Sequence, residues 1–342
     1  MPVALVTGAV MLRLPALLAT RHLSFDDGVY GASALAMRDG AAPFKDVFSS
    51  QGPLFLPLVW LADLVGLRTL NGPRLLALAA GAVLVAAVWT AARGAGCGRV
   101  PAGVGAALVA TSGSVLWVTG PLTSDGPALA LATTAVALAL AWRRAPALRT
   151  AVLCGVAMGA ALSVKSLLVP AAVPVGLVLL RRPRHLAAAT GVAVALGLAD
   201  VWDQSVTYHL EAAGDRTPGA NAAKVLSTLV DRDLPVVLAL AAALLAIRTR
   251  TGGRSPEPGD GTLVASWLAA TAVVLLLEHP LWRNHVAHLV PAGALLVALA
   301  LERAGPVLGR RAALAGGVAL AIAIPYHVAH GREVLWPSPP RG

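Results

Sequence analysis

Three aspartates stand where a carboxylate could take a proton from a substrate. Asp26 and Asp27 are adjacent in the segment Ser-Phe-Asp-Asp-Gly, and Asp125 lies in Thr-Ser-Asp-Gly-Pro. Adjacent carboxylates repel each other and lose solvation, which raises the basicity of one of them and suits it to general-base catalysis. The structural alternative is helix capping, because Ser and Asp are preferred N-caps and proline is favoured in the first turn. Capping does not exclude catalysis, so both interpretations remain open.

Basic side chains that could hold a phosphate follow in two places. Lys165 lies between two apolar stretches, where an ionisable group is costly and often functional. The alternative is a lysine that snorkels to the lipid head groups. Further on, Arg283 and His285 could supply phosphate contacts. His285 and His288, spaced i, i+3, could bind a metal, but no further ligand is evident nearby. We therefore assign no metal site, and nothing in the sequence indicates a cofactor.

Two long links between apolar stretches contain side chains suited to a substrate groove. The link 21–52 contains Tyr30 and Gln51, and the link 203–233 contains Tyr208 and His209. Because loops carry function more often than the elements that they connect, we predict that these links form the catalytic face. The four residues are then candidates for an acceptor groove. A solvated helix at the membrane surface is the alternative for most of the second link.

The composition is typical of an integral membrane protein. Of the 342 residues, 57% are hydrophobic and only 13% are charged, and the mean hydropathy is +0.74, which is too apolar for a soluble domain. The net charge of +10 does not indicate a nucleic-acid partner, because most basic residues sit in short links and aromatic residues make up only 4%. With two cysteines, a disulfide framework is not expected.

About twenty apolar residues cross a bilayer as a helix, and the chain divides into stretches of about this kind at its charged and Pro/Gly links. The first stretch contains Arg13 and lacks a basic start, which favours an uncleaved span over a signal peptide. We predict eleven spans, at 3–20, 74–92, 101–120, 125–142, 150–164, 166–180, 185–202, 234–247, 262–277, 288–301 and 312–328.

Charge predicts the orientation of these spans. Five links contain 14 arginines against three acids, and the positive-inside rule places such links in the cytoplasm. The other 14 acids share the opposite side only if the apolar stretch 53–70 makes no net crossing. We therefore predict a re-entrant or juxtamembrane helical hairpin there, in a plasma-membrane protein with a cytoplasmic N-terminus and an outer C-terminus. The arginines are at 93, 99, 143, 144, 149, 181, 182, 184, 248, 250, 254, 303, 310 and 311.

The order of several motifs resembles that of lipid-linked-sugar glycosyltransferases of the protein mannosyltransferase and aminoarabinose transferase superfamily. The motifs are Asp-Asp-Gly-Val-Tyr, Arg-Asp-Gly-x-x-Pro-Phe-x-Asp, Gln-Gly-Pro-Leu, Ser-Asp-Gly-Pro and Ser-Val-Lys-Ser. They lie in the part of the chain from 23 to 183. The resemblance implies an all-α polytopic membrane protein with the C-type glycosyltransferase fold. We expect residues 1–342 to form a single membrane domain, without the soluble C-terminal domain of some relatives.

The resemblance also implies roles. Asp26 corresponds to the base of such enzymes, Asp27 to the second acid of the pair, Asp125 to the acid of the next outer loop and Lys165 to the lysine that meets the donor phosphate. The implied reaction moves a sugar from a polyprenyl phosphate to an acceptor hydroxyl on the outer face, by inverting displacement. Many relatives have a lysine where this chain has Gln51, so the sugar and the acceptor are left open.

A polytopic transporter or lipid flippase is the main alternative, because many spans with scattered polar groups could also carry a solute. Transporters place ionisable groups near the bilayer midplane and often contain inverted repeats. In this sequence most acids fall in the predicted surface loops and no repeat is visible. The sequence therefore favours an enzyme with a lipid-linked sugar and the bilayer as its partners.

Overall fold

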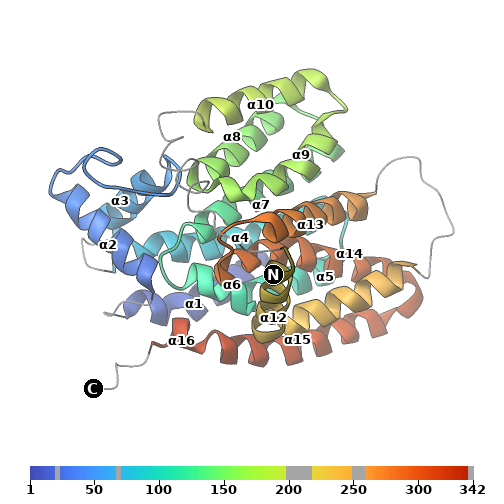
Figure 1. Ribbon diagram of the computed structural model, residues 1–342. Coiled ribbons are helices and arrows are strands. Elements are labelled where there is room, and N and C mark those ends of the chain that lie inside the picture. The colour runs from blue at the N-terminus through green and yellow to red at the C-terminus, as the bar shows by residue number, and fades with distance from the viewer. Residues whose placement is uncertain (20–23, 67–70, 198–217, 249–258, 338–342) are drawn as a thin grey trace.

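The computed structural model describes residues 1–19, 24–66, 71–197, 218–248 and 259–337, and this part of the chain is built of helices (Figure 1). Each of the eleven predicted spans falls mostly on helical residues where it is described, although the span 101–120 is interrupted at Ser112. The helices are α1 (Pro2–Leu18), α2 (Phe25–Arg38), α3 (Phe55–Val65), α4 (Arg74–Gly94), α5 (Arg99–Thr111), α6 (Gly113–Thr119), α7 (Asp125–Arg144), α8 (Leu148–Val164), η1 (Ser166–Ala171), α9 (Ala172–Leu179), α10 (Pro183–Gly197), α12 (Pro218–Arg248), α13 (Asp260–Leu277), η3 (Arg283–Leu289), α14 (Val290–Leu308), α15 (Arg310–His330) and α16 (Arg332–Leu335).

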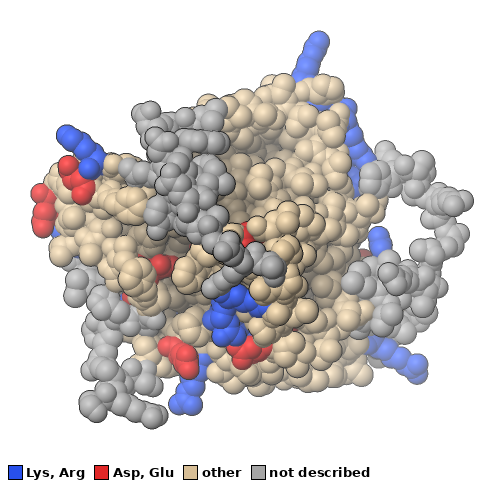
Figure 2. All heavy atoms as spheres, viewed as in Figure 1, with Lys and Arg blue, Asp and Glu red and all other residues tan. Residues whose placement is uncertain are grey.

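The helices show a multi-pass membrane protein, as predicted. Among the described residues, five helical segments are long and apolar enough to cross a bilayer: α4, α7, α13, η3 with most of α14, and most of α15. A sixth is formed if α5 and α6, which are bent by 59°, count as one span. Four further apolar segments are shorter than a full span: α1, α3, α8 and η1 with α9. The number eleven therefore stays a prediction. On the face drawn in Figure 2, charged side chains are few among uncharged ones.

The short helices α2 and α3 pack against each other at one end of the bundle (Figure 1). In the stretch 53–70, for which a hairpin was predicted, the described residues form one helix, α3. Arg38 on α2 donates from Nε and Nη2 to the carboxylate of Asp63 on α3, at 2.9 and 2.6 Å. The rings of Tyr30 and Phe55 meet edge to face, with centroids 4.6 Å apart. An 11-residue helix is about 16 Å long, roughly half the thickness of a hydrocarbon core. Helix α3 is therefore too short to cross a bilayer alone.

The arginine-rich links meet at one end of the bundle. The backbone N–H of Gly98 donates to Glu302 Oε2 at 2.6 Å, which joins the first link to the fifth. Arg143 forms an ion pair with Asp260, which joins the second link to the fourth. The charge pattern thus predicted which links lie together, because spans connected by short links must alternate in direction.

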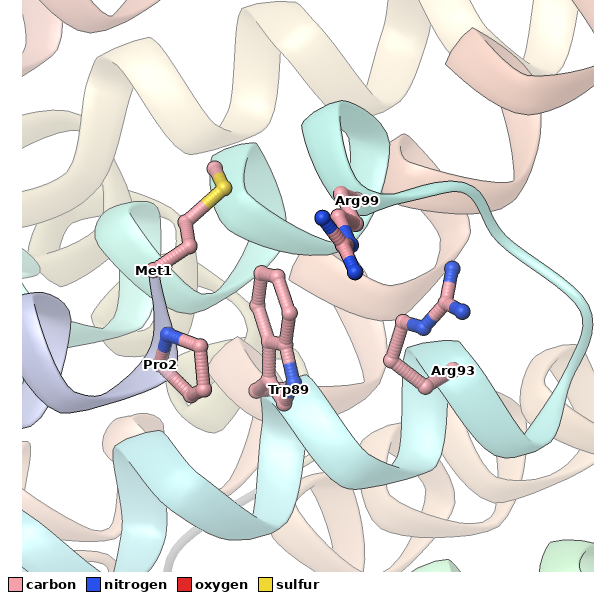
Figure 3. Close-up of a pocket in the computed structure, with 5 residues that line it drawn as sticks. All are labelled: Met1, Pro2, Trp89, Arg93 and Arg99. Carbon is pink, nitrogen blue, oxygen red and sulfur yellow. The ribbon is translucent and has the colours of Figure 1, made fainter.

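Helix α4 runs from one end of the bundle to the other. Arg74 begins this helix and Arg93 lies in its last turn, about 28 Å away along the axis. A pocket of about 400 Å³ lies at the Arg93 end, where Trp89 stands between Pro2 and the two arginines (Figure 3). This pocket is remote from the predicted acids, which lie at the Arg74 end. Its lining residues are Met1, Pro2, Trp89, Arg93 and Arg99.

A broken helix explains two buried charges in the apolar interior. In a continuous helix, the N–H of Ser114 would donate to the carbonyl of Ala110, but the chain bends at Ser112 between α5 and α6. The N–H of Ser114 instead donates to Asp233 Oδ2 at 3.2 Å, and Ala110 O accepts from Arg13 Nη1 at 3.1 Å. Arg13 and Asp233 therefore satisfy backbone groups that the bend exposes, as the interior of a membrane requires.

Candidate active site

Asp125 and Lys165 form a buried ion pair between α7 and α8. Asp125 Oδ1 lies 2.9 Å from Lys165 Nζ and 2.8 Å from His288 Nε2. The side chains of Asp125 and Lys165 are 4% and 13% exposed. Because the ammonium is held against a buried carboxylate, Lys165 does not snorkel to the surface. Ser124 makes no side-chain capping bond at the start of α7, and Asp125 directs an oxygen to two basic groups.

The first predicted loop fixes the position of Lys165. Helix α8 ends at Val164, whose carbonyl accepts from the N–H of Gly52 at 3.1 Å, and Ser163 O accepts from the N–H of Leu54 at 2.9 Å. A Cβ atom on Gly52 would lie 2.3 Å from Ser163 O, so only glycine permits this approach. The Gln-Gly-Pro-Leu motif therefore packs against the helix end that presents Lys165.

The pair Asp26 and Asp27 divides into two different environments, because neighbouring helical positions point about 100° apart. Asp27 is buried and accepts from Arg74 Nε at Oδ1 (3.0 Å), from Arg74 Nη2 at Oδ2 (2.5 Å) and from the N–H of Leu122 at Oδ1 (3.2 Å). Its own N–H donates to Ser24 Oγ at 3.2 Å, so Ser24 is the N-cap of α2. The partner of Asp27, Arg74, was not foreseen from the sequence, which gave only the start of a span there.

Asp26 has a different electrostatic environment, on the side of Asp125 and Lys165. Burial raises the pKa of the Asp26 carboxyl above its usual value, and the positive charge of Lys165 opposes that rise. The negative charges of Asp125 and Asp27 raise it further. A half-buried carboxylate of increased basicity is suited to accepting a proton. The structure thus brings together Asp26, Asp125 and Lys165, which lie far apart in the sequence.

Two of the predicted acceptor residues meet beside this cluster. Tyr30 is buried and its hydroxyl hydrogen-bonds with the side chain of Gln51. Gln51 Oε1 in turn accepts from Ser124 Oγ at 2.8 Å, one residue before Asp125. Burial raises the pKa of the Tyr30 phenol, which stays protonated and able to donate. The other two candidates, Tyr208 and His209, lie outside the described residues.

The segment between α13 and α14 contributes His285 and, unexpectedly, Glu278. His285 Nε2 lies 3.0 Å from Lys165 Nζ, and its Nδ1 lies 2.6 Å from Glu278 Oε1. The rings of His285 and His288 stack, with centroids 5.8 Å apart. Burial raises the pKa of Glu278 to about 8, against the opposing charge of Lys165. The sequence placed Glu278 at the start of the His/Arg segment but gave no signal that it faces His285.

The side chain of Arg283 contacts α12 and not the cluster around Lys165. Its side chain is 46% exposed, its Nη2 lies 2.5 Å from Asp231 Oδ2, and its Nε donates to Thr228 Oγ1 at 3.3 Å. These contacts join the start of η3 to α12. The structure therefore brings His285, but not the guanidinium of Arg283, into contact with Lys165.

The two histidines that could have bound a metal contact other groups: His285 contacts Lys165, and His288 contacts Asp125. Over the described ranges, no group of three or more His, Cys, Asp and Glu side chains has the spacing of a metal site. What the cluster offers is a lysine ammonium held between a carboxylate and an imidazole, with a basic carboxylate close by. These groups can bind an anion and accept a proton.

The fold is that of known membrane glycosyltransferases, as comparison with solved structures shows. ArnT from Cupriavidus metallidurans in the apo state superposes with a TM-score of 0.74 at 16% identity, covering 97% of this chain and 76% of ArnT. ArnT bound to undecaprenyl phosphate gives a TM-score of 0.71 at 14% identity, covering 97% and 75%. The arabinosyltransferase EmbB from Mycobacterium smegmatis gives 0.64 at 15% identity, covering 97% of this chain and 37% of EmbB.

These structures confirm the predicted C-type glycosyltransferase fold. The likeness is one of architecture, since identity is 16% or less. No protein-family profile and no curated protein matches the sequence.

Proposed function

We propose that this chain is a membrane glycosyltransferase that moves a sugar from a polyprenyl-phosphate donor to an acceptor hydroxyl. The observation that carries the proposal is the buried cluster of Asp125, Lys165 and His285 near Asp26. It occurs in the fold of ArnT, a protein that has been solved with undecaprenyl phosphate bound. A polyprenyl phosphate brings an anion to the membrane surface, and a held ammonium is a suitable partner for it.

Lys165 is assigned to the donor phosphate. An ammonium has three N–H donors, and Asp125 and His285 occupy two directions around Nζ. The third direction can serve a phosphate oxygen. As the bond to the sugar breaks, negative charge grows on the phosphate, and a fixed cation stabilises it most in that state. Arg283 is assigned to the same phosphate from the exposed rim, where binding requires it to leave Asp231.

Asp26 is assigned the role of general base. The acceptor hydroxyl gives its proton to the Asp26 carboxylate while its oxygen bonds to the anomeric carbon. The bond from that carbon to the phosphate oxygen breaks at the same time, and the polyprenyl phosphate leaves with the electron pair. Attack opposite the leaving group inverts the anomeric configuration. Asp27 supports this step by anchoring the first turn of α2 to Arg74.

The acceptor is assigned to the side of Tyr30 and Gln51. The chain Tyr30, Gln51 and Ser124 consists of neutral hydrogen-bonding groups that adjoin Asp125. Neutral donors and acceptors suit the hydroxyls of a sugar or a glycan better than a second phosphate. Tyr208 and His209 stay assigned to the same groove on the sequence prediction.

The orientation is part of the proposal. The arginine-rich end of the bundle is assigned to the cytoplasm and the end with Asp26 and Lys165 to the outside of the plasma membrane. The N-terminus is then cytoplasmic and the C-terminus is outside. The catalytic face accordingly meets lipid-linked donors in the outer leaflet.

Transport is the competing function, and one observation favours it. The chain bends at Ser112 between α5 and α6, and α12 is kinked at Asp233. Broken helices often line transport sites. However, Arg13 and Asp233 bind the backbone groups that the bend at Ser112 leaves unpaired. These contacts explain the buried charges by the structure of the bend, without a transport site.

The deciding experiment reconstitutes the protein in lipid with a panel of sugars linked to undecaprenyl phosphate and an acceptor extract. We expect at least one donor to release free undecaprenyl phosphate in an acceptor-dependent manner. Solute flux into vesicles, with no release from any donor, would replace the enzyme by a transporter.

A further inference from the structure

The pocket at the arginine-rich end of the bundle is not used by the proposed reaction. Its volume is about 400 Å³, within the range of about 300 to 1,000 Å³ that is usual for small-molecule sites. In Figure 3, the ring of Trp89 lies between Pro2 and the side chains of Arg93 and Arg99. The pocket therefore combines two cationic groups with an aromatic ring.

The turn between α4 and α5 brings the two arginines to one pocket. Helix α4 ends with a Schellman motif, in which the N–H of Cys97 donates to Ala92 O at 3.0 Å. The N–H of Gly96 donates to Arg93 O at 3.1 Å, and the φ of Gly96 is +91°, a conformation that favours glycine. Because this turn is short, Arg99 begins α5 beside the last turn of α4.

Most donors of the two guanidinium groups are available to a ligand. Arg93 Nη1 donates to Cys97 O at 2.6 Å, which holds this side chain over the turn. Among the residues that the structure describes, Arg93 has no other side-chain partner, and the side chain of Arg99 makes no hydrogen bond or ion pair. A guanidinium has five N–H donors, and both side chains are exposed. An anion can therefore meet them without displacing a partner.

No acid competes for these arginines among the described residues that line the pocket. Two acids at the same end of the bundle have other partners. Glu302 accepts from the N–H of Gly98 at 2.6 Å, and Asp260 pairs with Arg143. The positive charge of the pocket is thus left to attract an anion from outside the chain.

The depth of the pocket favours a lipid over a free anion. Helix α4 has 21 residues and is about 30 Å long, close to the thickness of a hydrocarbon core. Arg93, in its last turn, then lies at the level of the lipid head groups. Trp89 lies on the same face about 6 Å deeper, where tryptophan anchors are common. A free phosphate would use only the arginines, whereas a phospholipid reaches both levels.

The indole of Trp89 offers a further donor at this depth. Trp89 is half-buried, and its Nε1–H donates to no residue in the described part of the chain. A buried indole N–H usually has an acceptor. The ester carbonyls of a phospholipid lie deeper than its phosphate, so they can accept from Nε1 while the phosphate meets the arginines.

We propose that this pocket binds the head group of an anionic phospholipid: Arg93 and Arg99 hold the phosphate, and Trp89 packs against the glycerol esters. Basic pockets between membrane helices are a recurring form of lipid recognition. The bound lipid joins the start of α1 to the turn between α4 and α5, because Pro2 lines the same pocket. This inference is independent of the proposed function, whose site lies at the other end of α4.

The experiment measures lipid binding to the full chain by native mass spectrometry from detergent micelles. The probes are phosphatidylglycerol and phosphatidylcholine with the same acyl chains, which differ in net charge. Glycerol 3-phosphate, a water-soluble phosphate, is added as a competitor. The variants are Arg99→Gln, which removes no contact among the described residues, and the double variant Arg93→Gln/Arg99→Gln.

The matched control is the double variant Arg182→Gln/Arg184→Gln. It removes the same charge from two exposed arginines that do not line the pocket. They lie at the same end of the bundle, since Trp142 Nε1, next to the second arginine-rich link, donates to His185 Nδ1 at 3.0 Å.

We expect the wild type to bind phosphatidylglycerol more tightly than phosphatidylcholine. Arg99→Gln should weaken the binding of phosphatidylglycerol roughly tenfold, as for loss of one hydrogen bond to a charged group. The double variant Arg93→Gln/Arg99→Gln should weaken it further. The control should keep the wild-type affinity.

Equal losses in the pocket variants and in the control would show a general attraction to positive charge and overturn the inference. Equal affinity of the wild type for the two lipids would do the same. If glycerol 3-phosphate displaces the lipid at concentrations comparable to that of the lipid, the pocket is a site for soluble phosphates and the lipid assignment is wrong.

Discussion

Arg74 donates from Nε to Asp27 Oδ1 at 3.0 Å and from Nη2 to Asp27 Oδ2 at 2.5 Å, and thereby joins the start of α4 to the first turn of α2. The two side chains are only 4% and 3% exposed. A buried pair of this kind is strongly destabilised when one partner is removed, because the other charge is left unpaired in the interior. This pair holds together the elements beside the proposed catalytic groups.

Replacement of Arg74 by Leu should therefore reduce the free energy of unfolding by about 3 to 5 kcal/mol. The measurement is thermal unfolding in detergent, followed by tryptophan fluorescence. Arg283→Gln is the control, because its pair with Asp231 is about half exposed and should contribute no more than about 1 kcal/mol. Equal effects of the two substitutions would refute the structural role of Arg74.

Asp26→Asn should lower turnover by about 10² to 10⁴, the usual contribution of a general base. Asparagine keeps the shape of the side chain but does not accept the proton at neutral pH. Undecaprenyl phosphate binding and thermal stability should stay near wild type, since Ser24, not Asp26, caps α2. The measurement is single-turnover sugar transfer. Near-normal transfer by Asp26→Asn would remove this residue from catalysis.

Lys165→Met should weaken the binding of undecaprenyl phosphate by roughly 10- to 100-fold, as expected for loss of a charge-assisted contact. Isothermal titration in nanodiscs provides the measurement. Lys45→Met, which removes an exposed lysine of the first loop, is the matched control and should bind normally. Unchanged affinity in a folded Lys165→Met protein would leave Lys165 with a structural role only.

The pH dependence of stability should report Glu278. Its pKa is about 8 in the folded chain and near 4.5 when unperturbed, so the folded state holds an extra proton between these values. Stability then falls as the pH rises from about 4.5 to 8 and the contribution is lost above 8. Glu278→Gln should flatten this part of the profile of melting temperature against pH. Superimposable profiles would show that Glu278 does not titrate there.

The orientation can be tested with an impermeant thiol reagent on intact cells. A cysteine at Lys45 should react from outside, whereas one at Arg99 should react only after permeabilisation. Both positions are exposed, and the native Cys97 and Cys154 are buried and should add little background. Labelling of both positions in intact cells would contradict the assigned topology.

Hydropathy and charge predicted the helical spans because long apolar stretches and arginine-rich links are local features of a sequence. The order of motifs singled out Asp26, Asp125 and Lys165 as candidate site residues. Pairings across the fold were not visible, because Arg74 and Asp27 are 47 residues apart and a single sequence does not indicate which charges meet. The role of Arg13 was hidden for the same reason.

In the second long link, the assignment of Tyr208 and His209 to the acceptor groove stays a prediction, because both lie outside the described residues. Glu278 was missed although it is only seven residues from His285, because its contact depends on how the chain turns between α13 and η3. Residue type gave the chemistry of each group. The partner of each group came from the packing of helices.

The contacts of Arg13 have a consequence for the synthesis of this protein. Two of its three acceptors, Ala110 and Thr119, are 97 and 106 residues further along the chain. When the first span leaves the ribosome, its guanidinium can meet only the carbonyl of Ala9 in its own helix, and an arginine at the centre of a span opposes insertion by about 2.5 to 3.5 kcal/mol. We expect α1 to settle in the bilayer only after α5 and α6 have been translated, so that its integration comes later than its synthesis.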